Sequence, residues 1–290
     1  MTVVDEHLAT RRAAGLFDFS FMGLYEFERA VPAQTRDVDA LEPGQIAYTL
    51  ILKEDGAVRI DATVWRLDQT RYWLFAGKRA AYGGRDRSGE YAILALQGPS
   101  SGWILARLIG PDAVGGLRYF RFLEKDGLIV ARLGYSGELG YELLVPAAEA
   151  AALRRRLMQA GQAEGLRECT WPAADSLRIE AGYVLFDREV DGVANPRELG
   201  LERLAPGKSF DMKKKLVGLE IFDEAGSASL PAQVTSECFS ATLGRTIALG
   251  FASPAIGRGS AVRLPDGRVA RVCALPFYDP ERRRPRAAPL

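Results

Sequence analysis

The run GYSGELGYE at positions 134–142 decides most of what the sequence says about fold and function. Glycine recurs at every third position, at Gly134, Gly137 and Gly140, and Glu142 ends the run. Glycine permits tight turns and lets the backbone come close to a neighbouring group, such as a flat ring. Taken alone, the run favours a simple hairpin with a solvated Glu142 over a ligand site.

The segments around this run alternate between strand and helix patterns. The run 147–165 is rich in strong helix formers, and we expect Gly161 or Gly165 to end this helix. Another helix is predicted for 100–110, which has apolar residues at helical spacing and ends in a glycine. Strands are predicted for four runs rich in β-branched and aromatic residues: 91–99, 117–127, 128–137 and 140–146.

Three further apolar runs, 45–52, 57–67 and 71–77, are separated by KEDG and DQT and predict a three-strand meander. Side chains alternate across a strand, so Ile60 and its i+2 neighbours share one face and Asp61 points away from this more apolar side. Strands and helices in this mixed order predict an α+β fold.

A second unit is expected toward the C-terminus. The segment DSLRIEAG at 175–182 reads as a helix with Asp175 at its start, and the Pro/Gly-containing stretch 195–207 makes a boundary. We therefore divide the chain into 1–205 and 212–290. Four apolar runs then predict a small antiparallel β-barrel or sandwich: 216–222, 246–252, 260–265 and 268–277. The polar tail 281–290 is expected to be frayed.

The amino-acid composition excludes some classes of binding partner. The chain of 290 residues carries Lys+Arg 38 against Asp+Glu 37, a net charge of +1, which argues against nucleic acid and acidic membranes as partners. No run approaches the roughly 20 apolar residues of a membrane span. Three cysteines without CxxC spacing favour a reducing, cytoplasmic location. His7 is the one histidine of the chain, so a metal site with several histidines is excluded, and a Ser/His/Asp triad is possible only if His7 belongs to it. His7 lies in a polar run, and we expect its side chain to be solvated or to cap a helix.

Six runs occur in the same order as motifs of one family. They are DEHLATRRAAGLFDFS, AVRIDATVWRL, LALQGP, GYSGELGYELLVP, DSLRIEAG and SATLGRTIALGF, and the ending PFYDPERRR follows them. On these motifs the chain is identified as a shortened member of the family that contains glycine cleavage T-protein (aminomethyltransferase) and the folate-binding domains of dimethylglycine dehydrogenase and sarcosine oxidase. The resemblance implies an N-terminal folate-binding part with a ferredoxin-like unit, then a small C-terminal antiparallel β-barrel, around a central opening that holds tetrahydrofolate.

The resemblance assigns two carboxylates. Glu142 matches the residue that binds the pterin, whose 2-amino group and adjacent ring N–H are donors that one carboxylate accepts together, and with the resemblance this interpretation is favoured over the hairpin. Asp61 matches the catalytic aspartate, which stabilises an iminium-like cation and accepts a proton. The family's adjacent aspartate is replaced by Ile60. The alternative for Asp61 is an exposed strand residue.

Four more side chains are implied as folate contacts. Tyr48 matches a tyrosine that lines the folate cavity, and Tyr135 and Tyr141 flank Glu142, although ordinary core packing explains each tyrosine as well. Arg178 would reach the pterin oxygen or a folate carboxylate. Its alternative is a helix-surface salt bridge with Glu180 or Asp175.

Two hypotheses about function remain. The first is a tetrahydrofolate-dependent one-carbon (aminomethyl or methyl) transferase that acts on a small-molecule donor. The second is a non-catalytic folate-binding subunit, or a degenerate paralogue, that serves a separate flavin-dependent methylamine-oxidising enzyme. The ending FYDPERRR favours the methylamine-oxidising branch of the family. In that branch the partner would be a separate flavoprotein subunit, because this chain carries no flavin fingerprint. The other possible partner protein is a lipoyl carrier. Shortened segments between Phe27 and Gln45 and before LVGLE would alter the pocket or partner surface.

Overall fold

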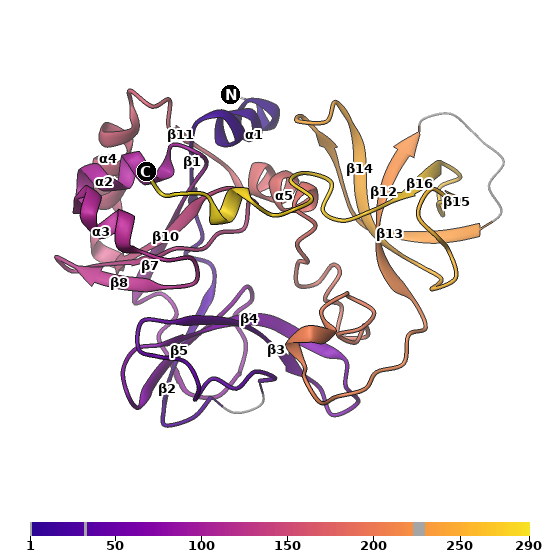
Figure 1. Cartoon of the computed structure of the whole chain (residues 1–290), viewed down its shortest axis with the longest axis horizontal. Helices are drawn as coiled ribbons and strands as arrows, with labels where there is room; N and C mark the ends of the chain where they lie inside the picture. Colours follow the sequence, from indigo (N-terminus) through magenta and orange to yellow (C-terminus); the bar gives the residue numbers. More distant parts are fainter. Residues whose placement is uncertain (1, 32–33, 223–229) are drawn as a thin grey trace.

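A computed structural model describes residues 2–31, 34–222 and 230–290. Three β-structures surround the centre of the molecule: a six-stranded sheet, a five-stranded sheet and a closed barrel (Figure 1). The mixture of helices and sheets, with the barrel in the C-terminal region, confirms the predicted fold class. The division into 1–205 and 212–290 stays a prediction, because a domain boundary is a statement about independent folding.

The six-stranded sheet has the order β11-β1-β7-β10-β9-β8. Helices α2, α3 and α4 bury their apolar residues against one of its faces, where Leu94 and Leu143 of the sheet meet Ile104 and Leu157 of the helices. Its elements are β1 (Gly15–Asp18), β7 (Tyr91–Gln97), α2 (Ser101–Ile109), α3 (Pro111–Gly116), β8 (Phe122–Lys125), β9 (Leu128–Ala131), β10 (Gly140–Pro146), α4 (Ala150–Gly161) and β11 (Arg167–Glu168).

The five-stranded sheet contains the predicted meander and has the order β3-β4-β5-β2-β6. It lies against the other face of the six-stranded sheet, with Trp65 and Phe75 packed on Ile93 and Leu144. Ile60 is buried in this sheet's own core, and Asp61 projects to the opposite side, as the alternation predicted. Its strands are β2 (Gly23–Glu28), β3 (Ile46–Leu52), β4 (Val58–Arg66), β5 (Arg71–Ala76) and β6 (Arg85–Asp86).

The barrel closes in the order β12-β14-β13-β15-β16, and only its β13–β15 pairing is parallel among the described pairings. The sequence reading missed β13, whose LPAQVTSECFS mixes polar and apolar residues without strict alternation. Its buried side chains are four apart, at Ala232, Ser236 and Ser240, with partly buried Val234 and Cys238 between them, and the register shifts between Val234 and Ser236. The strands are β12 (Lys215–Phe222), β13 (Leu230–Ser240), β14 (Arg245–Ala252), β15 (Ala261–Arg263) and β16 (Val269–Cys273).

Two helices join these parts. Helix α1 (Val3–Arg12) begins with a capping box in which Thr2 and Asp5 bond each other's backbone N–H groups. Helix α5 (Trp171–Glu180) begins after Thr170 with a proline in its first turn, so Asp175 lies in mid-helix and the prediction that it starts the helix is wrong. No helix in the described ranges is long and apolar enough to cross a membrane.

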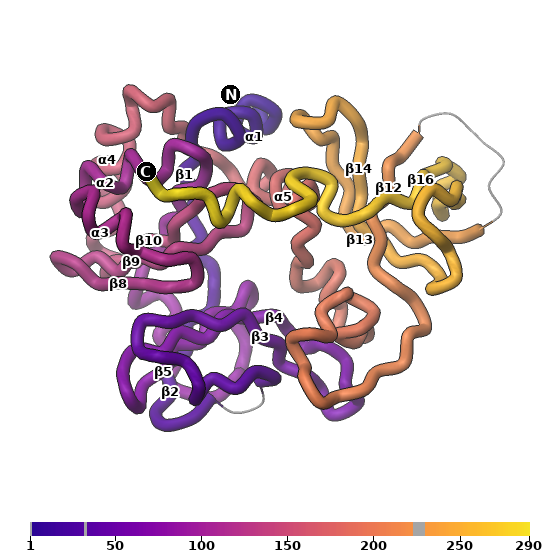
Figure 2. Tube along the Cα trace, viewed as in Figure 1, coloured from indigo at the N-terminus to yellow at the C-terminus, as the bar shows by residue number. Residues whose placement is uncertain are grey.

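The C-terminal strap, residues 277–290, runs from the barrel across α5 to the six-stranded sheet (Figure 2). The N–H groups of Phe277 and Tyr278 donate to the Glu180 carbonyl at 2.9 and 3.1 Å, Pro285 is buried, and Leu290 packs on the sheet core. The prediction of a frayed tail is therefore wrong. One arginine of this arginine-rich segment, Arg284, donates to Glu138 outside the strap at 3.3 Å.

Candidate functional site

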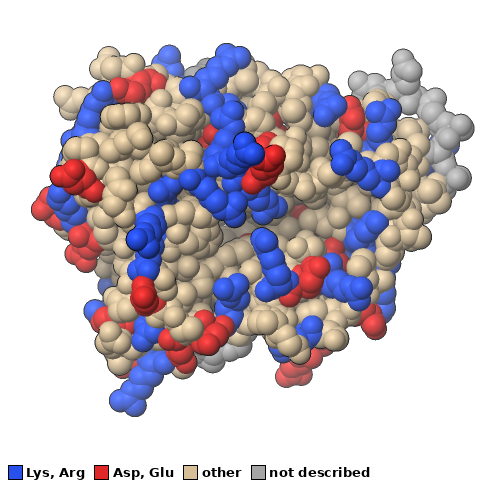
Figure 3. Space-filling view, in the orientation of Figure 1, with Lys and Arg blue, Asp and Glu red and all other residues tan. Residues whose placement is uncertain are grey.

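A cavity of about 910 Å³ lies where the two sheets, α5, the 182–204 loop and the strap meet. Two carboxylates, several aromatic rings and four arginines are among its lining residues. The face of the molecule in Figure 3 is hollowed near its centre, and basic side chains gather around this hollow.

Asp61 and Tyr48 form one polar site in the wall of the cavity. They lie on neighbouring strands, and the Tyr48 hydroxyl donates to Asp61 Oδ2 at 2.9 Å. Burial raises the pKa of Asp61 above its ordinary value, an effect that the bond from Tyr48 partly offsets and the charge of Glu189 increases. Burial, and then the Asp61 charge, raise the pKa of Tyr48 well above its ordinary value. Asp61 therefore holds a proton more readily than a solvated aspartate, as suits a group that exchanges protons.

Glu142 forms the second polar point. It lies on β10 in the middle of the six-stranded sheet and is only 5% exposed. Within the described ranges its carboxylate has no hydrogen-bond or ion-pair partner, and burial alone raises its pKa to about 7. Buried polar groups in folded proteins normally have partners. A carboxylate that is aimed into a cavity without one is suited to accept donors from a ligand.

Aromatic rings form the wall between these points. The Tyr135 hydroxyl donates to the Val184 carbonyl at 2.6 Å, and its ring lies between those of Trp171 and Tyr183, with centroids 6.4 and 6.0 Å away and nearly parallel planes. All of these residues line the cavity. These residues give the cavity an aromatic wall, and aromatic rings are groups on which a planar ligand ring can pack.

Tyr141 lies elsewhere. It neighbours Glu142 on β10 and therefore points to the opposite face, where it is fully buried in the core and does not line the cavity. Burial raises its pKa to about 12, and its hydroxyl has no partner among the described atoms. Of the two interpretations of Tyr141, the structure favours core packing.

Two of the glycines in 134–142 make room for a protein side chain. A Cβ at Gly134 or Gly140 would lie 1.9 or 2.3 Å from Oε1 of Gln97, which accepts a hydrogen bond from the Ser136 hydroxyl at 2.8 Å. Gly137 has φ +78°, a conformation that favours glycine. These glycines fix the turn that precedes Glu142.

Arg178 is fully buried behind the wall and does not line the cavity. Its guanidinium donates to Asp175 at 2.7 Å, to Glu189 at 2.8 Å and to the Tyr183 carbonyl at 3.1 Å. The alternative salt bridge with Asp175 is thus present, although buried rather than on the surface. Since Glu189 also accepts from the Leu185 N–H at 3.0 Å, the pair fixes the loop that carries Tyr183 into the cavity.

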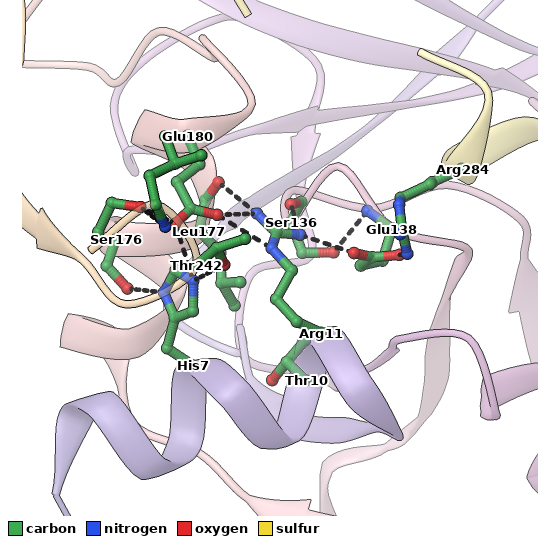
Figure 4. Close-up of polar contacts among 12 residues, drawn as sticks. His7, Thr10, Arg11, Ser136, Glu138, Ser176, Leu177, Glu180, Thr242 and Arg284 are labelled. Atoms are coloured by element: carbon green, nitrogen blue, oxygen red, sulfur yellow. Dashed lines mark hydrogen bonds and ion pairs between the residues drawn. The ribbon is translucent and has the colours of Figure 1, made fainter. Parts of the chain in front are cut away.

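His7 belongs to a second buried cluster, shown in Figure 4. Its ring nitrogens lie 2.7 Å from Ser176 Oγ and 3.0 Å from Glu180 Oε1, and it is 1% exposed, so the prediction of a solvated or capping role is wrong. The set has the composition of a Ser/His/acid triad. Ser176 is buried and does not line the cavity, however, so no substrate reaches it there.

The same cluster ties α1 to the rest of the molecule. Arg11 donates to Glu180 at 2.8 Å and to Glu138 at 3.1 Å, and Arg284 of the strap lies 3.3 Å from Glu138. Burial alone would raise the pKa of Glu180, but the bond from His7 and the charges of Arg11 and His7 outweigh it and lower the pKa to about 2. In the described part of the chain, no group of three or more His, Cys, Asp or Glu side chains could hold a metal ion.

Sequence reasoning missed several lining residues: Arg36, Tyr119, Trp171, Tyr183, Arg203, Arg282 and Arg286. Only the arginine-rich ending carried a usable signal. The others lie in loops or helix starts whose place at the cavity depends on the tertiary fold.

Comparisons with known proteins agree with the motifs. The GCVT N-terminal domain matches residues 1–208. The chain is 34% identical to the aminomethyltransferase of Symbiobacterium thermophilum over 98% of this chain and 91% of that protein, and 32% identical to that of Streptomyces coelicolor over 94% and 89%. It superposes on the crystal structure of glycine cleavage system aminomethyltransferase T from Bartonella henselae with a TM-score of 0.79 at 26% identity, over 96% of this chain and 90% of that one. The chain therefore belongs to the glycine cleavage T-protein (aminomethyltransferase) family.

Proposed function

We propose that this protein is a tetrahydrofolate-dependent one-carbon transferase. The observation that carries the proposal is Glu142, a buried carboxylate without a partner among the described residues, in a cavity that Asp61 and Tyr48 also line. The named activity of its relatives, aminomethyltransferase, is a one-carbon transfer and supports the reaction class.

The charge pattern of the cavity fits a folate from end to end. The pterin presents N–H donors, which Glu142 accepts, and its flat ring suits the aromatic wall around Tyr135. The other end of a folate carries carboxylates, and the exposed residues of the cavity include arginines. Folate binding is thus supported at three separate points.

Tetrahydrofolate, when bound, supplies the nitrogen that receives the one-carbon unit. Asp61 would stabilise the positive charge that develops at the donor carbon as its bond to the leaving group breaks and that group departs with the electron pair. It would also accept the proton that the folate nitrogen loses as the new carbon–nitrogen bond forms. Tyr48 holds the Asp61 carboxylate in one orientation through its 2.9 Å hydrogen bond. Glu142 fixes the pterin, and the aromatic wall keeps water away from the reacting atoms.

The donor in this proposal is a small aminomethyl or methylated amine compound, delivered by a lipoyl carrier or produced by a separate flavoprotein. The competing hypothesis is a folate-binding subunit without turnover. It is favoured by one observation: the second aspartate of the family motif is Ile60, which is buried at 2% exposure.

Titration of tetrahydrofolate and folinic acid against four proteins tests the proposal: wild type, Glu142→Ala, Asp61→Asn and the control Asp68→Asn. Glu142→Ala should weaken binding by about 10- to 100-fold, since a hydrogen-bonded charge contributes roughly 1.5–3 kcal/mol. Asp61→Asn should keep the affinity within about threefold and lower turnover by roughly 10²–10⁴-fold. Asp68 lies in the β4–β5 turn outside the cavity, so its variant should change neither quantity.

A wild type that binds neither ligand would sink the proposal. A wild type that binds folate but shows no turnover that Asp61→Asn can remove would leave the binding subunit in its place.

A further inference from the structure

The aromatic wall of the cavity is built from two different elements. Tyr135 lies in the turn 134–139 that precedes β10, and Trp171 is the first residue of α5. The planes of their rings are only 15° apart, and both residues line the cavity. A planar ligand can pack on both rings only if the turn and the helix keep a fixed separation and orientation.

The turn has several bonds that do not reach α5. The Tyr135 hydroxyl donates to the Val184 carbonyl in the loop after α5, and the Ser136 hydroxyl donates to Gln97 on β7. Near the end of α5, a Cβ at Gly137 would lie only 2.8 Å from the Ala181 side chain, so the turn packs closely there. This contact is apolar and does not by itself fix an orientation.

Arg11 of α1 bonds to the turn and to α5 at the same time (Figure 4). Its Nη1 donates to the Ser136 carbonyl at 2.8 Å and to Glu138 at 3.1 Å, and both of these residues are in the turn. Its Nε and Nη2 donate to Glu180 of α5 at 3.0 and 2.8 Å, and Nη2 also lies 3.3 Å from the Leu177 carbonyl. The guanidinium is planar and rigid, so these bonds fix the turn relative to the helix.

The surroundings of Arg11 strengthen these bonds. Its side chain is buried, with Glu138 on one side and Glu180 on the other, and both carboxylates are buried as well. The Tyr278 ring of the strap covers the guanidinium, with its centre 4.1 Å away. Buried, charge-assisted hydrogen bonds are short, directional and little screened by salt.

We propose that Arg11 is a positioning residue for the ligand site. It holds Tyr135 and Trp171 in the arrangement that a planar ligand ring needs, and it does not line the cavity itself. The inference rests on the proposed function for the identity of the ligand and assigns to α1 a part in shaping the site. The bridge between turn and helix can be measured without any ligand.

Titrations of folinic acid against wild type, Arg11→Lys and His7→Gln test the effect on binding. Lysine keeps the charge but is a point charge on a flexible stem, so Arg11→Lys should weaken binding about tenfold. His7→Gln is the matched control. His7 belongs to the same buried cluster but contacts Ser176, Glu180 and Thr242 rather than the turn. Its variant should keep the affinity within about threefold.

A double-mutant cycle with Tyr135→Leu separates positioning from a general loss of structure. If Arg11 acts through the ring of Tyr135, Arg11→Lys should change the affinity by less than about twofold once that ring is absent. Hydrogen exchange without ligand reports on the bridge itself. Amides of the turn 134–139 should exchange about tenfold faster in Arg11→Lys and at the wild-type rate in His7→Gln.

If Arg11→Lys does not fold, Glu138→Ala takes its place, because it removes a bond on the turn side only. Its affinity loss and faster exchange should have the same direction, and its effect should likewise vanish in the Tyr135→Leu background.

Two results would overturn the inference while leaving the proposed function intact: equal losses of affinity in Arg11→Lys and His7→Gln, or independent effects of Arg11→Lys and Tyr135→Leu. Unchanged exchange of the turn in Arg11→Lys would overturn it whether or not folinic acid binds. A wild type that binds no folate would refute the proposed function, and with it the role of Arg11 in folate binding.

Discussion

Glu142 and Glu180 are both glutamates with at most 5% exposure, yet their surroundings differ completely. Glu180 receives bonds from His7, Arg11 and Ser240, and its pKa falls to about 2. Glu142 receives none within the described ranges, and its pKa rises to about 7. The fold thus surrounds Glu180, which links α1, α5 and the barrel, with hydrogen-bond and ion-pair partners. It leaves unpartnered the carboxylate that faces the cavity.

The largest effect on stability is expected for Glu180→Ala. Removing Glu180 from this buried cluster takes one of the two carboxylates from Arg11 and the carboxylate partner from His7, which costs about 3–5 kcal/mol of unfolding free energy. Urea unfolding at pH 7 measures it. Glu168→Ala, at a half-exposed glutamate, should stay within about 0.5 kcal/mol. A loss below about 1 kcal/mol for Glu180→Ala would remove the contrast between the two sites.

Glu142→Gln should raise the free energy of unfolding, whereas Glu180→Ala lowers it. The folded-state pKa of Glu142 is raised from its ordinary 4.5 to about 7, so the native state binds the extra proton and wild-type stability falls as pH rises through that window. The glutamine variant escapes this loss. Relative to wild type, it should gain up to roughly 3 kcal/mol between pH 4.5 and pH 8.

Unfolding titrations of both proteins across this range measure the difference. A wild type whose stability runs parallel to that of the variant would mean that Glu142 has a partner in solution.

The raised pKa of Glu142 should also make ligand affinity depend on pH, which is a smaller effect. If the ionised Glu142 accepts the pterin donors, wild-type affinity for folinic acid should fall by up to about tenfold per pH unit below about 7. Glu142→Gln should bind weakly with no such dependence. Calorimetric titrations between pH 5.5 and 8 give both curves, and a flat wild-type curve would argue against Glu142 as the acceptor.

Tyr48→Phe should have the smallest effect. It removes one hydrogen bond at a cavity wall, worth about 0.5–1.5 kcal/mol of unfolding free energy. Since that bond lowers the pKa of Asp61, its loss should move the acid limb of the activity profile to higher pH. An unchanged acid limb would mean that Asp61 does not control it.

Local pattern was enough to predict the parts of the site that depend on neighbouring residues. Strand alternation placed Asp61 on the side away from the sheet core, and the motif order led to the family and to Glu142. Contacts over long sequence distances could not be derived in this way. His7 meets Ser176 and Glu180, which are 169 and 173 positions away, and no local rule distinguishes such a histidine from a solvated one.

Composition alone was misleading in two places. The polar strap resembles a frayed end, yet Leu290 packs against a sheet core formed by residues 14–166. The glycines before Glu142 resemble a cradle for a ligand, yet Gly134 and Gly140 accommodate Gln97. Both sequence patterns indicate which backbone conformations are possible. Which residue packs against that backbone depends on the tertiary fold.

The strap also bears on how the protein is made. Asp61 and Glu142 emerge from the ribosome well before Arg282 and Arg286, which line the same cavity. A nascent chain that has folded both sheets still has a cavity open on one side, with two buried carboxylates near water. The cavity is then completed only after the segment 277–290, which follows both sheets in the chain, has been made. A substitution that removes the Leu290 side chain from the sheet core should delay this completion.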